Sequence, residues 1–294
     1  MEMRQLRYFV AVVEAGSFSR AAAVLHMAQP SLSRQMALLE TEVGQRLLAR
    51  NGRGVEITDA GQSLLVHARS ILQIAQRALD ELQDIGDSPA GRICIGMPPR
   101  VAIGLSAPLI QRFRARYPRA VITVLEGLSV SMRASLIAGE LDMALLFDPA
   151  PSTLLSYEIL SREKLLIVGP PKSQFPTRVS IAALASYPMV LPSPPNAIRG
   201  LLDARLKPAG VQLQLLAEVG AVRTVLALVN AGMGCTILPE SALTLPADDA
   251  LARAPIGPPN IWNTLVLATP VTRPATRLQR GTAKLLQALD FRRG

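Results

Sequence analysis

Residues 17–40 predict two short helices joined by a tight turn, and this pattern constrains the fold more than any other feature of the chain. Ser17 is the expected N-cap of the first helix. Apolar side chains then recur at helical spacing, so one side of this helix should face a core. These side chains are Phe18, Ala21, Ala22 and Leu25.

The second helix of the pair is predicted to begin near Pro30, because proline fits a first helical turn, where its missing N–H needs no partner. Leu32, Met36 and Leu39 follow at i, i+4 and i+7, which indicates a buried face. The opposite face is polar, with short or forked hydrogen-bonding side chains that suit base edges and phosphates. The arrangement predicts a helix-turn-helix that reads DNA.

Two amphipathic helices and a turn could also be an αα-hairpin packed in a core. Residues 46–58 favour the DNA-binding interpretation, because Asn-Gly and Arg-Gly steps between short apolar runs predict a small hairpin that carries Arg50 and Arg53. A basic hairpin beside a recognition helix is typical of a wing that reaches an adjacent groove or phosphate. The predicted DNA-binding residues are Gln29, Pro30, Ser31, Ser33, Arg34, Arg50 and Arg53.

Residues 1–90 resemble the winged helix-turn-helix and linker helix of the LysR-type transcriptional regulators. The resemblance rests on Leu6-Arg7-Tyr8-Phe9, Gly16-Ser17-Phe18, Gln29-Pro30-Ser31-Leu32-Ser33, and Leu39-Glu40 before Gly44. A weaker resemblance, which also involves Gly96-Met97-Pro98-Pro99, is to regulators of the nitrogen-assimilation-control type, and it does not carry the nitrogen role with it.

One position departs from the family pattern. Ala28 stands where the family often has Ser or Thr before the Gln-Pro pair, so the recognition helix should lack a side-chain cap. Such a loss typically costs about 1 kcal/mol.

From Thr58 the sequence predicts a long helix that continues to residue 86, where the first glycine after Gly61 interrupts it. At about 1.5 Å per residue this is a rod of roughly 40 Å, which is too long to be covered by one small domain. A heptad of apolar residues indicates a partner helix, and the family resemblance implies dimerisation and two DNA half-sites. A helix packed within the monomer and a solvent-covered spacer are the alternatives. The heptad positions are Leu64, Ala68, Ile71, Ala75, Ala78, Leu82 and Ile85.

Residues 87–91 read as a linker, and the rest of the chain alternates short apolar runs with helical stretches. This alternation indicates α/β architecture with mainly parallel sheets. The expected strands are 92–97, 121–126, 142–147, 164–168, 213–219, 235–238 and 264–268, and the expected helices are 103–116, 130–139, 198–208, 221–232 and 274–289.

This layout resembles the effector-binding domain of the LysR-type family, which is similar to the periplasmic-binding-protein fold. The whole chain is therefore expected to be of mixed α+β and α/β class: a winged helix-turn-helix (1–58), a linker helix (59–90) and a two-lobed α/β domain (91–294). Residues 91–165 and 268–294 would form one lobe and 166–267 the other. The chain would cross twice between lobes, so a small-molecule effector would bind between them.

The positive charge is not in the DNA-reading half. Residues 1–90 carry nine Arg, no Lys and ten acidic side chains, which gives −1, whereas residues 91–294 carry twenty-two basic and twelve acidic side chains, which gives +10. DNA contact must therefore depend on a few placed arginines rather than on bulk charge. The excess charge of the second half is either solvated surface or a preference for an acidic ligand or partner.

Effector contacts are expected in loops beyond the carboxyl ends of strands, where helix N-termini present N–H groups to anions. Arg100 follows paired prolines where the family often has Ser or Thr, and its guanidinium could hold a carboxylate with two bonds. The alternative is that Arg100 faces solvent or pairs with an acid. The predicted effector-binding residues are Pro99, Arg100, Val101, Ser129, Phe147, Asn196, Ile198, Arg199 and Thr224.

Enzyme chemistry is not supported, and no cofactor or metal is expected. His26 and His67 both lie in the DNA-binding half, so the larger unit has no histidine base. Cys94 and Cys235 lack zinc-ligand spacing and read as buried thiols, with a reversible disulfide as the alternative. The chain has no Walker A sequence and no dinucleotide fingerprint.

The chain opens on a helical pattern rather than a signal peptide, and no apolar run approaches the length of a membrane span, so a cytoplasmic protein is expected. This also argues against a solute-binding protein for transport. We therefore expect a transcriptional regulator whose partners are a dyad-symmetric operator, a small, anionic effector and a second copy of the chain. The family resemblance adds a homotetramer and RNA polymerase as further candidate partners.

Overall fold

A computed structural model describes residues 1–51, 54–83, 89–272 and 274–291. The side chains of Arg50, Asn51, Arg77 and residues 80–83 lie outside this description. The chain divides into two compact units: unit 1 contains Met1–Gly91 and Ile137–Glu140, and unit 2 contains Arg92–Leu136 and Leu141–Gly294. No helix in the described parts combines the length and the apolar character that crossing a membrane requires.

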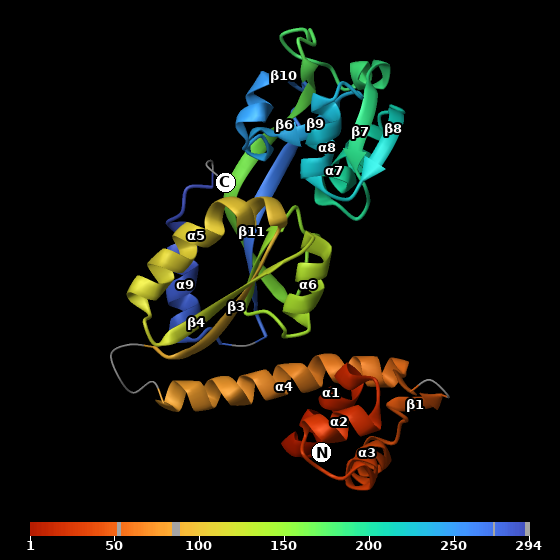
Figure 1. Ribbon diagram of the computed structural model, residues 1–294, viewed down its shortest axis with the longest axis vertical. Helices are drawn as coiled ribbons and strands as arrows, with labels where there is room; N and C mark the ends of the chain where they lie inside the picture. The colour runs from red at the N-terminus through yellow and green to blue at the C-terminus, as the bar shows by residue number, and fades with distance from the viewer. Residues whose placement is uncertain (52–53, 84–88, 273, 292–294) are drawn as a thin grey trace. The chain divides into compact units, whose positions relative to one another are not determined.

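Unit 1 begins with three helices around one core: α1 (Met3–Ala15), α2 (Phe18–Val24) and α3 (Gln29–Val43) (Figure 1). Helix α1 ends at Gly16, whose positive φ of 60° suits glycine and lets its N–H reach the carbonyls of Val12 and Val13. The pair α2 and α3 confirms the predicted helix-turn-helix. Its core residues include Leu6, Phe9, Val12, Phe18, Ala21, Ala22, Leu32, Met36 and Leu39.

The two helix starts differ in part from expectation. Ser17 is the N-cap of α2, as predicted, but its side chain makes no cap hydrogen bond, so this start depends on packing of the buried Phe18. Ala28 is the N-cap of α3 and provides no side-chain cap, as its methyl group requires. Pro30 lies in the first turn of α3, which confirms the predicted start.

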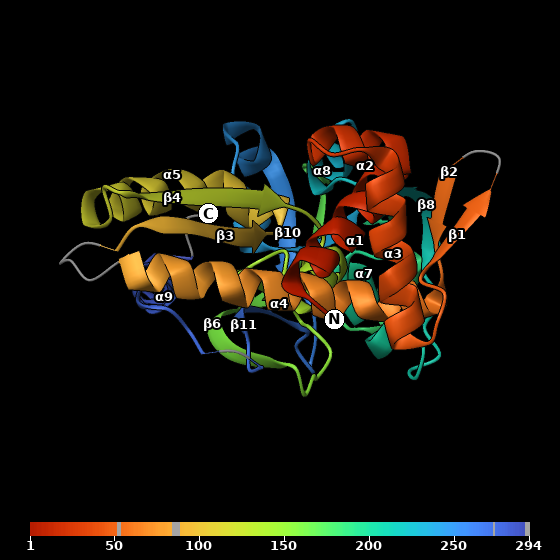
Figure 2. The ribbon, with the colours of Figure 1, turned by 90° about the horizontal axis from the view of Figure 1, so that it is seen from below.

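The predicted basic hairpin is present as β1 (Leu48–Asn51) and β2 (Gly54–Ile57), which pair antiparallel. The Glu40 carboxylate accepts hydrogen bonds from the Leu47 N–H at 2.8 Å and the Leu48 N–H at 3.1 Å. Helix α3 is therefore tied to the base of the wing (Figure 2). Arg53 lies outside the described residues, as does the side chain of Arg50.

Helix α4 (Asp59–Gln83) follows the wing and corresponds to the predicted linker helix. The Thr58 hydroxyl accepts the Gly61 N–H at 3.0 Å and so caps its start. Ala68 is fully buried in the unit 1 core and Leu64 packs against that core, so these two heptad positions serve the monomer. Ile71 remains 37 % exposed, whereas Ile85 and the Leu82 side chain lie outside the described residues. The residues of α4 that could pack against a partner helix therefore lie after Ala68.

The start of α4 is closely packed at a glycine. A methyl group on Gly61 would collide with the backbone carbonyl of Leu47. Gly200 lies on an exposed part of helix α7 (Ala197–Leu206), and a methyl group there would meet nothing within 4 Å. The two glycines form a matched pair for testing packing in unit 1.

We expect Gly61→Ala to destabilise unit 1 by about 1–3 kcal/mol, because backbone must move to admit the methyl group. Gly200→Ala should be neutral or stabilising by about 0.5–1 kcal/mol, because alanine is the better helix former. Scanning calorimetry of the full chain measures both changes. Equal effects of the two substitutions would contradict the packing at Gly61.

Unit 2 contains two hydrophobic cores. The first is built from β3 (Gly91–Met97), α5 (Pro99–Arg116), β4 (Ala120–Glu126), β5 (Met143–Phe147) and α9 (Arg277–Gln287), and α6 (Ser129–Ile137) connects β4 to β5. The second contains β7 (Pro188–Pro192), α7, α8 (Val222–Asn230), β9 (Thr236–Pro239) and β10 (Leu251–Pro255), and β8 (Gln214–Val219) pairs with β7. Three short 3₁₀ helices, Ala182–Ser186 (η1), Glu240–Ala242 (η2) and Pro246–Ala250 (η3), complete it.

Two long strands, β6 (Leu155–Pro171) and β11 (Trp262–Pro270), pass through both cores (Figure 1). Along β6, Leu160 packs on the first core and Leu165 is buried in the second. On the other crossing, Ile261, next to the start of β11, is buried in the second core, and Leu265 in the first. The two strands pair antiparallel from Trp262↔Lys164 to Pro270↔Leu155.

The expectation of mainly parallel sheets is wrong. β11 pairs antiparallel with β5 and β6, and β6 also pairs antiparallel with β9 and β10, whereas β3–β5 and β7–β8 are parallel. The antiparallel pairs arise because β6 and β11 run in opposite directions between the cores. Strands β7 and β10 and the first half of β6 were not predicted, since prolines end β7 and β10 and polar side chains interrupt β6.

Candidate functional site

The polar face of α3 is the first candidate site. Pro30, Ser31 and Arg34 are exposed, and Gln29 and Ser33 are partly exposed, whereas Leu32, Met36 and Leu39 are buried on the opposite side. The core therefore fixes which side of the helix is presented to solvent. The predicted recognition residues of α3 therefore all lie in its first two turns and are accessible to solvent.

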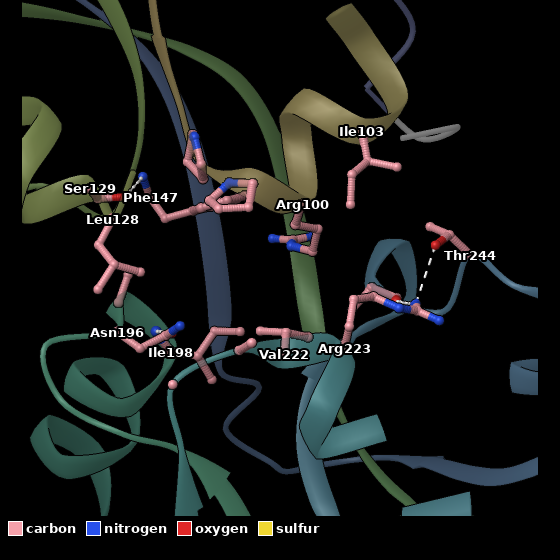
Figure 3. Close-up of a pocket in the computed structure, with 16 residues that line it drawn as sticks. Arg100, Ile103, Leu128, Ser129, Phe147, Asn196, Ile198, Val222, Arg223 and Thr244 are labelled. Atoms are coloured by element: carbon pink, nitrogen blue, oxygen red, sulfur yellow. Dashed lines mark hydrogen bonds between the residues drawn. The ribbon is translucent and has the colours of Figure 1, made fainter. Parts of the chain in front are cut away.

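The second candidate site is a cavity of about 200 Å³ between the two cores of unit 2 (Figure 3). Four helices begin at its wall: α5 at Pro99, α6 at Ser129, α7 at Ala197 and α8 at Val222. The remaining wall is mainly apolar. The lining residues are Pro98, Pro99, Arg100, Ile103, Leu128, Ser129, Phe147, Asn196, Ala197, Ile198, Gly220, Ala221, Val222, Arg223, Ala242 and Thr244.

Local hydrogen bonds fix two of these helix starts. The Asn196 carboxamide oxygen accepts the Ile198 N–H at 3.0 Å and caps α7. The Ser129 hydroxyl accepts the Phe147 N–H at 2.9 Å, which ties the start of α6 to the end of β5. Both polar side chains are thus held in place at the cavity wall before any ligand arrives.

Arg100 lines the cavity but its charge is already paired. Its guanidinium donates to the Ser241 hydroxyl and, at 3.0 Å, to the Asn263 carboxamide oxygen, and it lies 3.7 Å from a Glu163 carboxylate oxygen. It also stacks over the Phe147 ring, 4.3 Å from the ring centroid. Burial lowers the pKa of Arg100 and the Glu163 carboxylate opposes that shift. The structure therefore favours the alternative that Arg100 pairs with an acid.

These contacts join both cores through the crossing strands. Glu163 on β6 and Asn263 on β11 are direct cross-strand partners. The Glu163 carboxylate also accepts hydrogen bonds from the Ser241 N–H at 3.1 Å and the Ser241 hydroxyl at 2.8 Å, which brings in η2. Arg100, at the start of α5, therefore binds side chains from β6, β11 and η2 at once.

Asp148 ends this polar network. Its carboxylate accepts the Asn263 side-chain N–H at 2.7 Å and the Thr264 backbone N–H at 3.1 Å. Burial raises the pKa of Asp148, and the hydrogen bonds from Asn263 and Thr264 oppose the shift without cancelling it. The ionised carboxylate is thus less favourable here than in water.

The other arginines near the cavity are also paired. Both terminal nitrogens of Arg223 lie 3.0 Å from the buried Asp248 carboxylate, and one donates to the Ala242 carbonyl at 3.2 Å. Arg199 donates to Asp203 at 3.0 Å and also to Glu218. Neither guanidinium provides an unbalanced charge.

The predicted effector residues Pro99, Arg100, Ser129, Phe147, Asn196 and Ile198 line the cavity. Three others do not form part of the described lining. Val101 is 5 % exposed in the first core, Arg199 binds two carboxylates, and Thr224 lies in the first turn of α8, exposed to solvent. Their proximity in sequence to lining residues was the misleading signal, because helical geometry turns adjacent side chains by about 100°.

The sequence did not indicate Arg223, Ala242 and Thr244 as lining residues. Arg223 lies in the first turn of α8, one position before the predicted Thr224. Ala242 and Thr244 follow β9 in the η2 segment, where no predicted helix start marked them. Only the tertiary fold brings this segment to the cavity.

Within the described residues, no group of three or more His, Cys, Asp or Glu side chains could hold a metal ion. Burial raises the pKa of the Cys94 and Cys235 thiols, which disfavours the reactive thiolate. Cys235 belongs to the second core, and Cys94 lies on β3 in the first.

We expect the free energy of unfolding of the wild type, minus that of Asp148→Asn, to fall as pH rises from about 3.8 through the raised pKa of Asp148. The sign follows because the native carboxyl group binds its proton more tightly than the unfolded one. Urea unfolding of both proteins across the acidic range, followed by Trp262 fluorescence, measures the difference. A difference that stays constant or grows with pH would contradict the buried setting of Asp148.

The sequence was compared with protein families. Residues 3–62 match the bacterial regulatory helix-turn-helix protein of the lysR family, and residues 86–289 match the LysR substrate binding domain. The chain belongs to the LysR family. This confirms the expected winged helix-turn-helix and the two-lobed domain, and it makes the protein a DNA-binding transcriptional regulator with an effector-binding domain, not an enzyme.

Similar LysR regulators include the nitrogen assimilation regulatory protein nac of Escherichia coli, 37 % identical over 243 residues, which are 82 % of this chain and 79 % of that protein. The nac protein of Klebsiella aerogenes is 35 % identical over 267 residues, 89 % of this chain and 83 % of that protein. The expected likeness to nitrogen-assimilation-control regulators is therefore confirmed.

Solved structures show the same architecture. CbnR in complex with its target DNA has a TM-score of 0.64 at 26 % identity, covering 98 % of this chain and 99 % of CbnR. A full-length OxyR variant from Pseudomonas aeruginosa has a TM-score of 0.78 at 21 % identity, covering 99 % of this chain and 96 % of OxyR, and shows the fold alone.

Proposed function

We propose that the effector of this LysR regulator is a small anion with apolar parts, and that it binds in the cavity between the two cores of unit 2. The convergence of four helix N-termini on that cavity carries the proposal. Each helix N-terminus presents a partial positive charge of about half an elementary charge. The apolar wall suits the remainder of a compact metabolite.

In this proposal, the helix N-termini contribute more to the positive potential of the cavity than the arginine side chains do. Glu163 and Asp248 already balance Arg100 and Arg223, so these two ion pairs leave no net charge at the wall. Unbalanced positive potential then comes from backbone N–H groups at the starts of α5, α6, α7 and α8. The effector contacts that we propose are Pro99, Arg100, Ser129, Phe147, Asn196, Ile198, Val222, Arg223 and Thr244.

The same geometry suggests how binding reaches DNA. An effector that touches helices of both cores favours one relative arrangement of the lobes, and it shifts the population only by its difference in affinity between arrangements. The contacts of Arg100 would change with the arrangement of the lobes, because this side chain links the start of α5 to β6, β11 and η2. We propose a domain division of 1–58, 59–90 and 91–294. Within the third domain, we propose that the chain passes from one lobe to the other inside β6 and again inside β11.

We propose that the protein binds its operator as a dimer through the outer part of α4. Ile71, Ile74 and Leu79 are exposed there by 37 %, 44 % and 54 %. Two copies would place two recognition helices on two half-sites of a dyad-symmetric operator in the cytoplasm. A homotetramer and a contact with RNA polymerase are further proposals, which sedimentation on DNA and bacterial two-hybrid assays test.

On DNA, the proposed contacts come from α3 and the wing: Gln29, Pro30, Ser31, Ser33, Arg34, Arg50 and Arg53. Arg34→Ala should weaken specific binding to DNA from upstream of the protein's own gene by about 1–3 kcal/mol, because a forked base contact is lost. Its melting temperature should be unchanged, since the side chain is exposed. Electrophoretic shifts against unlabelled competitor measure this. Wild-type affinity in a folded Arg34→Ala protein would remove Arg34 from the interface.

For the cavity, we expect a screen of small carboxylates to find one that raises the melting temperature of the full chain, whereas the matching amide does not. Val222→Trp should abolish the shift by filling the cavity, and Thr224→Val, outside the lining, should keep it. Arg34→Ala should keep the shift and lose DNA binding. A carboxylate shift that survives Val222→Trp would place the effector elsewhere.

A further inference from the structure

Helices α5 and α9 of unit 2 together carry a strongly basic surface that the effector cavity does not use. We define the α5–α9 basic face as Arg112 and Arg116 on α5 and Arg277, Arg280 and Lys284 on α9. All five side chains are exposed. Arg277, Arg280 and Lys284 recur at i, i+3 and i+7, so they form one stripe along α9.

Helices α5 and α9 pack side by side (Figure 1). The Arg112 guanidinium donates to the Ala288 carbonyl at the end of α9, 3.0 Å away. At the other end of the contact the Tyr117 hydroxyl lies against Gly281, and the Arg116 guanidinium is 6.0 Å from the Tyr117 ring centroid.

The cations of α9 flank this contact. Arg277 precedes Gly281 by one turn and Lys284 follows it by one turn, so both lie beside the α5 residues. From Arg277 to the level of Arg112, at Ala288, the face extends over roughly 16 Å at 1.5 Å per residue. This is long enough for several successive phosphates of a nucleic-acid strand.

These charges are not balanced internally. None of the five cations forms an ion pair with a carboxylate among the residues that the structure describes. Glu158, at the border of α9, is held by the Gln287 amide at 2.7 and 2.8 Å. Four arginines elsewhere in unit 2, Arg100, Arg199, Arg223 and Arg253, each have an acidic partner.

We infer that the α5–α9 basic face binds the phosphate backbone of duplex DNA. Four of its five cations are arginines, whose forked guanidinium groups suit phosphate oxygens. Phosphate contacts need only a row of accessible cations and carry no sequence information, which fits an exposed stripe without a shaped pocket. The ligand is therefore duplex backbone, independent of base sequence.

The charge distribution of the chain favours DNA over an acidic protein. Unit 1, which holds the recognition helix, belongs to a segment with a net charge of −1, whereas the rest of the chain carries +10. A regulator of this composition has few phosphate contacts available beside its recognition helix. DNA held by unit 1 is also present at high effective concentration for a second surface on the same chain.

The experiment compares full-length proteins on DNA from upstream of the protein's own gene, with long flanking duplex on both sides. The test variant Arg116→Gln/Arg277→Gln/Lys284→Gln removes three exposed cations of the face and leaves the Arg112 and Arg280 hydrogen bonds in place. The control Lys172→Gln/Arg205→Gln/Lys207→Gln removes three exposed cations from the surface of the lobe that contains the second core. Melting temperature and Trp262 emission confirm the fold of both variants.

The measured quantity is the slope of log affinity against log salt concentration. Each phosphate contact contributes about 0.9 to this slope, so the test variant should lose about one to three units and the control none. A slope equal to that of the wild type would overturn the inference. Equal losses in both variants would overturn it too, because bulk charge would then be responsible.

Transcription from the same promoter separates the two partner classes. If the test variant keeps the wild-type slope but loses regulation, the DNA assignment fails and the face belongs to an acidic protein surface. Because Arg34 and the recognition helix are intact in both variants, competitor-resistant binding should persist. Loss of that specificity in the wild type itself would instead count against the operator-binding function.

Discussion

The antiparallel pair β6–β11 is the constraint on which the rest of unit 2 depends. Both strands leave one hydrophobic core and enter the other, so the relative position of the cores is set by a single ladder that includes the pair Glu163↔Asn263. The helices that follow the strands of each core start at this junction. The cavity, its four helix N-termini and the side chains of Arg100 and Asp148 are consequences of that crossing.

The electrostatics of the cavity follow from the same junction. A buried arginine without a partner would be costly, and Glu163, Ser241 and Asn263 satisfy Arg100 from three elements. The internal pairs leave an apolar wall, and we propose that its positive potential comes from backbone dipoles. Such a cavity can attract an anion without an unpaired side chain, and a ligand that disturbs Arg100 would alter contacts in both cores.

Features set by local sequence could be predicted, and those set by long-range pairing could not. The helix-turn-helix follows from Ser17, Pro30 and the spacing of Leu32, Met36 and Leu39, all within one segment. The Arg100–Glu163 pair joins residues far apart in sequence, and no local pattern distinguishes it from an arginine free to bind an anion. For the same reason the sequence missed Ala242 and Thr244.

The linker helix shows a second limit. Its heptad is real as a sequence pattern, but the first positions, Leu64 and Ala68, pack on the unit 1 core. Periodicity identifies the apolar face of a helix and does not say which surface covers it. The direction of the chain in β6 and β11 was likewise invisible to strand-by-strand prediction, which gave mainly parallel sheets.

The most direct test of the central claim, that the interlobe cavity of this LysR regulator selects anions through its helix N-termini, is an anomalous difference map from a crystal soaked in bromide. The account predicts a bromide inside the cavity, near the starts of α6, α7 or α8 and in contact with Ser129 or Asn196. Bromide ions on exposed cationic surfaces, with none in a solvent-accessible cavity, would contradict it.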